Sequence, residues 1–184
     1  MTNSVRRSLE RFGVLIASAL LAGCGTDFSK FEALTIKRAG SFELDMKPDD
    51  AFPLFTAPGE KLWISMWEPF ILNGDGYEEG TVWVTAGHGH KTYWNVADYD
   101  TDAGHARYVR VTPEANSGTV DVSVTSNGNG GSTVIVTYQL TGLSDAGNEN
   151  IAKLLGEAEF ARMMQDWRRM INENREKIDD HFSR

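Results

Sequence analysis

Apolar and polar side chains alternate in short stretches between residues 81 and 141. The clearest stretch is 133–141, where Val134, Val136, Tyr138 and Leu140 fall on one face of an extended chain. Gly, Asn, Asp and Pro gather between the stretches, so each gap predicts a tight turn and the strands form antiparallel hairpins. The predicted strands are 41–46, 81–85, 91–99, 106–111, 119–125 and 133–141, and the predicted turns are 87–89, 100–104, 113–118 and 127–131.

Helices are predicted in two places: after the first strand and after the last one. Pro and Asp in residues 47–55, and Pro58 in residues 58–63, indicate two short helices after the first strand. Beyond Ser144 or Asp145, either of which can cap a helix, apolar residues recur every three or four positions as far as Ile178. We therefore predict one long amphipathic C-terminal helix whose apolar stripe covers the sheet.

The N-terminal segment has a different pattern. Arg6, Arg7 and Arg11 precede an apolar stretch, 12–21, that is too short to span a bilayer. The residues Leu21-Ala22-Gly23-Cys24 then resemble the lipobox of bacterial lipoproteins, which implies lipid attachment at Cys24. We expect a signal peptide at 1–23, a lipidated cysteine and tether at 24–34, and one domain at 35–180. The alternative, a free thiol after an apolar leader, explains the arrangement less well.

This resemblance also implies a location. We expect the mature protein in the bacterial cell envelope, on the periplasmic side and anchored by lipid. The absence of Asp at position 25 would permit passage to the outer membrane. The pattern leaves open the export route and the choice between inner and outer membrane.

Charge and cysteine content narrow the function classes. The formal net charge of −8 becomes −10 once residues 1–23, which carry +2, are removed, so nucleic acid is not an expected partner. Cys24 is the only cysteine, and the chain cannot form an internal disulfide. The remaining residues suffice for one hydrophobic core.

The order of these elements, together with several short motifs, resembles the START-like (SRPBCC) superfamily, which includes polyketide cyclases and lipid-transfer domains. The resemblance spans 41–178 and implies an α+β helix-grip fold: a curved antiparallel β-sheet wrapped around a long C-terminal α-helix, with two short helices after the first strand. The motifs are Phe42-Glu43-Leu44-Asp45 with Pro48 and Phe52, Trp67-Glu68-Pro69 after Trp63, Gly80-Thr81-Val82-Trp83, and Val136-Thr137-Tyr138 with Leu143-Ser144 and Gly147.

The same resemblance implies a cavity between the helix and the concave face of the sheet, which binds apolar molecules across the superfamily. Large aromatic and methionine side chains suit such a cavity, although any one of them can equally fill an ordinary core. Strand parity does not settle which face Trp83 and Trp94 occupy. The candidate lining residues are Trp63, Trp67, Phe70, Trp83, Trp94, Tyr138, Met163, Met164 and Trp167.

Metal and catalytic motifs are weak. His88 and His90 would share one face of a strand, but flanking glycines favour a solvated turn, and a third ligand would have to come from His105, Asp98 or Asp100. Residues 98–104 have the acidic spacing of a calcium loop without its glycine and glutamate positions. We expect no cofactor, and no catalytic residue is assigned.

Three functions remain. We favour a membrane-anchored protein that binds an apolar small molecule or lipid in the cavity. The alternatives are a cyclase or aromatase-type enzyme acting in the same cavity and a non-catalytic interaction module. The sequence indicates neither the ligand, a protein partner nor the oligomeric state.

Overall fold

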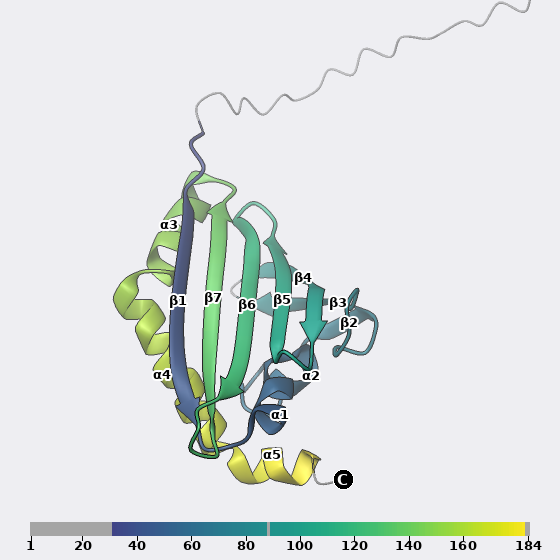
Figure 1. Cartoon of the computed structure of the whole chain (residues 1–184). Helices are drawn as coiled ribbons and strands as arrows, with labels where there is room; N and C mark the ends of the chain where they lie inside the picture. Colours follow the sequence, from purple (N-terminus) through teal and green to yellow (C-terminus); the bar gives the residue numbers. More distant parts are fainter. Residues whose placement is uncertain (1–30, 88, 183–184) are drawn as a thin grey trace, which may run out of the picture. The chain divides into compact units, whose positions relative to one another are not determined.

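A seven-stranded antiparallel sheet forms the body of the protein (Figure 1). The computed structural model describes residues 31–87 and 89–182. The strand order is β1-β7-β6-β5-β4-β3-β2, so the first strand pairs with the last and every other neighbour is a hairpin partner. The strands are β1 (Thr35–Leu44), β2 (Phe70–Asn73), β3 (Val82–Gly87), β4 (His90–Asp100), β5 (His105–Thr112), β6 (Asn116–Ser126) and β7 (Ser132–Gly142).

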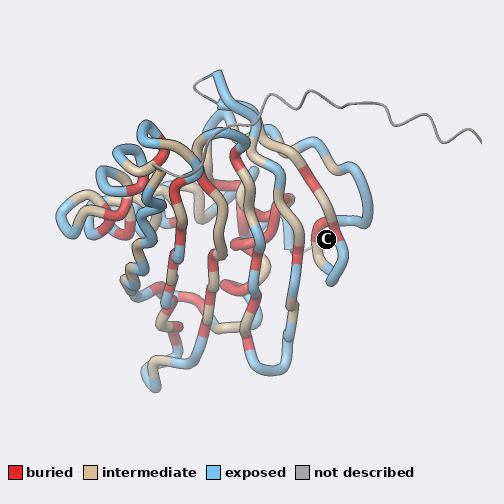
Figure 2. The backbone as a smooth tube through the Cα atoms, turned by 90° about the horizontal axis from the view of Figure 1, so that it is seen from above, coloured by how far each residue is buried: buried red, intermediate tan, exposed pale blue. Residues whose placement is uncertain are grey.

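Six of these strands overlap those predicted from the alternating pattern. In β7 the residues Val134, Val136 and Leu140 are fully buried, while Ile135 and Gln139 between them are exposed. Figure 2 shows how buried and exposed positions succeed one another along the strands. The sheet therefore has one inner face towards the core and one outer face. The strand that was not predicted, β2, has four residues and an irregular register with β3, too short to show an alternation.

Three short helical turns follow β1, as α1 (Pro48–Ala51), the 3-10 turn η2 (Phe52–Phe55) and α2 (Ala57–Glu60). Thr56 caps α2, because its Oγ1 accepts a hydrogen bond from the amide of Gly59 at 3.1 Å. Indole groups tie the next loop to these turns: Trp63 Nε1 donates to the carbonyl of Leu54 at 2.8 Å and Trp67 Nε1 donates to that of Ala57 at 3.0 Å. The two predicted short helices are present.

The predicted single long helix is divided into three: α3 (Asp145–Leu154), α4 (Glu157–Glu173) and α5 (Arg175–Phe182). Ser144 caps α3, as expected, by accepting from the amide of Gly147 at 3.0 Å. The first break comes at Leu155 and Gly156, and Gly156 has an extended ψ of 143°. Leu155 is fully buried, so the chain leaves helical geometry exactly where this side chain enters the core. The spacing of apolar residues continues through the break, which explains why the sequence did not reveal it.

The helix layer packs on one half of the sheet. The main contacts of α3 are with β7 and those of α4 are with β1 (Figure 1). Gly40 in β1 allows this close approach, since a Cβ at position 40 would lie 2.7 Å from Cγ of Met164 and 3.1 Å from Cε1 of Phe160. At the far end, α5 is joined to the loops around α1 and α2: Arg175 Nη1 donates to the carbonyl of Asp45 and Lys177 Nζ donates to that of Lys61.

The described residues from Phe31 onward form one compact unit, which holds the sheet, the helix layer and the core. In the part of the chain that the structure describes, no helix has both the length and the apolar character required to cross a bilayer. The predicted signal peptide and Cys24 lie outside the described residues.

Candidate functional site

The inner face of the sheet is wider than the helix layer that covers it. Because α3 and α4 pack mainly on β7 and β1, the inner face of β4 and β5 is left partly open. A pocket of about 580 Å³ lies there, between these strands and the helices. We call it the Arg110 pocket. The residues that line it on the sheet side include His90, Thr92, Arg110, Thr112 and Asn116, and those on the helix side include Ala146, Asn150, Lys153, Leu154 and Glu159.

Arg110 is the central charged group of this pocket. It occupies an inward position of β5, directly opposite Trp94 of β4, and its Cζ lies 4.9 Å from the centre of the Trp94 ring. Nη2 donates to Thr112 Oγ1 at 3.3 Å, whereas the buried Nε makes no hydrogen bond. Burial lowers the pKa of this guanidinium, although it stays protonated at neutral pH.

Two groups of aromatic rings lie on the inner side of the sheet, and the first contacts Arg110 through Trp94. In the first, Trp83 and Trp94 are opposite each other on β3 and β4, and their rings stack with centroids 5.7 Å apart. Trp67 meets the Trp94 ring edge-on at 6.4 Å, and Tyr108 meets that of Trp83 at 5.7 Å. Trp83 and Trp94 therefore both face inwards, which resolves the ambiguity left by the strand pattern.

The second group joins the short helical turns to α4. Trp167 of α4 packs edge-on against Trp63 at 5.5 Å and stacks on Phe55 at 6.3 Å. Nearer the start of α4, Phe160 meets the Tyr138 ring at 5.8 Å. These contacts connect the far end of the inner face to the helix layer.

The nine predicted cavity residues differ in burial and in the face of the sheet on which they lie. Trp63, Trp83, Tyr138 and Met164 are buried within the core, and Trp67, Trp94, Met163 and Trp167 are partly buried. Phe70 is 66% exposed on the outer face of the sheet. It pairs with the outward Val84, whereas its neighbour Ile71 pairs with the inward Trp83. None of the nine is among the residues that line the Arg110 pocket.

Apart from His90, which was considered only as a metal ligand, the sequence analysis did not identify the polar residues of this pocket. Arg110 nevertheless left a signal: in β5 the inward positions are Ala106, Tyr108, Arg110 and Thr112, so a charged residue interrupts a face that should be apolar. Asn116, also buried in the pocket wall, has an Oδ1 atom with no hydrogen bond to a described residue.

Glu60, at the end of α2, is a second partly buried ionisable group that was not predicted. Burial raises the pKa of its carboxyl group from 4.5 to about 8. Burial raises the pKa of Tyr108 and brings that of Tyr138 to about 12, and the charge of Glu60 contributes to both shifts. The Glu60 carboxyl is therefore electrostatically coupled to two tyrosines of the inner face, and it is largely protonated in the folded protein at pH 7.

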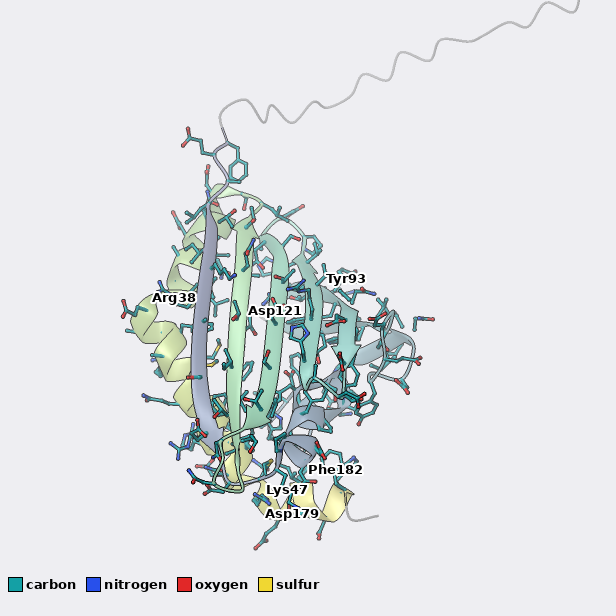
Figure 3. All side chains as sticks on the ribbon, in the orientation of Figure 1. Arg38, Lys47, Tyr93, Asp121, Asp179 and Phe182 are labelled. Atoms are coloured by element: carbon teal, nitrogen blue, oxygen red, sulfur yellow. The ribbon has the colours of Figure 1, made fainter. Side chains whose placement is uncertain are left out.

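The histidine and aspartate candidates are spread over different surfaces. His88 lies outside the described residues, and His90 is exposed at the start of β4, on the rim of the Arg110 pocket. His105 is on the outer face, with Nδ1 2.7 Å from Asp98 Oδ2 and Nε2 3.6 Å from Asp121 Oδ1 (Figure 3). Asp100 closes the turn after β4 by accepting from the amide of Ala103. Within residues 31–87 and 89–182, no three His, Cys, Asp or Glu side chains are grouped closely enough to hold a metal ion.

Several solved structures superpose on this chain over most of their length. No family model and no curated protein matches the sequence. Norcoclaurine synthase from Thalictrum flavum, in complex with dopamine and hydroxybenzaldehyde, superposes with a TM-score of 0.57 at 14% identity over 92% of this chain and 98% of that one. Ara h 8.0201 gives 0.55 at 14% identity, covering 78% and 98% of the two chains. Major latex-like protein 151 from Panax ginseng gives 0.56 at 15% identity, covering 76% and 97%.

At these identities the likeness establishes the fold alone. The strand order, the short helices after β1 and the C-terminal helix all agree with it. The chain therefore has the helix-grip fold that Bet v1-like and START-like proteins share.

Proposed function

We propose that this protein binds an apolar small molecule or lipid between α3–α4 and the inner face of β4 and β5. The observation that carries the proposal is the Arg110 pocket, because its volume of about 580 Å³ is within the usual range for one small-molecule ligand. Leu154 lines this pocket and Trp94 lies against Arg110, and both pack on the core while each keeps part of its surface accessible. A ligand would bury this remaining apolar surface.

The comparisons support a binding role. Proteins of this fold include one whose structure contains two small aromatic molecules, dopamine and hydroxybenzaldehyde. The aromatic rings of this chain could pack against an apolar or aromatic ligand in the same way.

A pocket-filling variant tests the proposal. Asn150 is an exposed residue of α3 that lines the pocket, and Glu149 beside it is exposed and does not line it. We expect Asn150→Trp to weaken uptake of a fluorescent fatty acid by residues 31–184 at least tenfold, because the indole occupies the ligand volume. The matched variant Glu149→Trp should bind as the wild type does. Equal uptake by all three proteins, or none by the wild type, would count against binding in this pocket.

We also propose that lipid attached to Cys24 holds the domain at a membrane of the bacterial cell envelope, where it could take up or deliver its ligand. The support is the sequence Leu21-Ala22-Gly23-Cys24 behind a basic and apolar leader. We expect Cys24→Ser, expressed in a bacterial host, to move the protein from the membrane fraction to the soluble fraction. Sedimentation of that variant with the membranes would contradict the anchor.

A cyclase or aromatase-type enzyme is a second candidate, favoured by Glu60. A carboxyl group with a pKa near 8, electrostatically coupled to Tyr108 and Tyr138, has a proton affinity suited to general acid–base chemistry near neutral pH. If the protein is such an enzyme, Glu60→Gln should abolish turnover while ligand binding persists. The absence of turnover by the wild type across a panel of polyketide-like substrates would exclude this candidate.

A further inference from the structure

Arg110 carries a charge that the described protein does not neutralise. No Asp or Glu oxygen lies within 4.0 Å of its guanidinium among the described residues, and only one of its five N–H donors makes a hydrogen bond. A partly buried cation without a partner anion is costly, because the protein replaces only part of its hydration.

Arg38 provides the contrast within the same sheet. It occupies an inward position of β1 (Figure 3), and its Nε donates to the carbonyl of Leu155 at 3.0 Å, at the C-terminal end of α3. This carbonyl is at the negative end of the helix dipole, so the charge of Arg38 has a structural partner. Arg110 has only the face of Trp94 and the hydroxyl of Thr112.

We propose that Arg110 binds the carboxylate of an amphipathic ligand whose apolar part packs against Trp94 and the neighbouring core. This inference rests on the proposed function and specifies the class of ligand. A guanidinium can donate two parallel hydrogen bonds to a carboxylate. Nη1 is available for them, because it bonds to no described residue and is not among the buried unpartnered atoms.

The other charged residues of the pocket are less suited than Arg110 to bind a carboxylate. Glu159 is paired with Arg162 one turn along α4, and Glu114 and Lys153 are exposed. These rim charges are screened by solvent, whereas Arg110 lies deeper, against the Trp94 ring. A carboxylate that reached Arg110 would therefore meet one strong, weakly hydrated cation.

The test compares two ligands of equal chain length, myristic acid and 1-tetradecanol, by isothermal titration calorimetry with residues 31–184 at pH 7.5. We expect the wild type to bind the acid at least tenfold more tightly than the alcohol. Arg110→Met should remove this preference by weakening binding of the acid alone, and Arg110→Lys should retain part of it. Lys91→Met, which removes an exposed cation of β4 that does not line the pocket, should keep the preference within about threefold.

The outcomes separate this inference from the proposed function. If the wild type binds both ligands equally, or if Arg110→Met weakens both to the same extent, the carboxylate site is wrong while apolar binding stands. If neither ligand binds to the wild type, the proposed function fails and the inference fails with it. Arg110→Gln, which keeps a polar side chain, provides a second neutral variant should Arg110→Met not fold.

Discussion

Replacing Phe160 with alanine is expected to lower the free energy of unfolding by about 3–5 kcal/mol. Phe160 is 2% exposed and fills the space between α4 and the inner face, where it contacts the Tyr138 ring and lies against Gly40. The shortened side chain leaves a cavity that the sheet cannot close, because Gly40 has no side chain to move into it. Urea unfolding of residues 31–184 measures the loss, and the midpoint of thermal unfolding should fall by about 10 °C.

Gln165→Ala is the matched control for this prediction. Gln165 is an exposed residue of the same helix, and its replacement should change stability by less than about 0.5 kcal/mol. A loss below about 1 kcal/mol for Phe160→Ala would show that α4 does not pack on β1 as described.

Glu60→Gln is expected to stabilise the protein at high pH and to leave it nearly unchanged at low pH. Burial raises the pKa of Glu60 from 4.5 to about 8, so the folded state binds this proton more tightly than the unfolded chain does. Unfolding then releases the proton between pH 4.5 and 8, and the stability contributed by Glu60 falls as the pH rises through this window. The neutral glutamine avoids the loss.

At pH 8.5 we expect Glu60→Gln to be more stable than the wild type by about 2–4 kcal/mol, and at pH 4.5 the two should be similar. Urea unfolding at both pH values gives the difference in free energy of unfolding between the variant and the wild type. The contributions of other titrating groups are the same in both proteins and cancel in this difference. Glu79→Gln, at an exposed position, serves as the control and should show no comparable dependence. A stability difference for Glu60→Gln that is the same at both pH values would contradict a buried, protonated carboxyl group.

Much of the helix-grip fold could be predicted because its signals are local. The alternation in residues 133–141 predicts β7 and its inward residues, and turn residues between the stretches predict the hairpins. The cap at Ser144 is likewise a property of neighbouring residues. The lining of the candidate site was not predicted in this way: none of the nine aromatic and methionine candidates lines the Arg110 pocket, and Phe70 lies on the outer face.

Other features were decided by tertiary structure, since they depend on residues distant in the chain. The break at Gly156 coincides with burial of Leu155, and β2 exists because β3 offers it an edge. The raised pKa of Glu60 comes from what surrounds it in the fold. Whether Arg110 has an ion-pair partner depends on which carboxylates the fold places beside it, and among the described residues there is none. The sequence by itself thus determined the order of strands, turns and caps, whereas only the packing of α3 and α4 over half of the sheet decided where the pocket opens and which charge it contains.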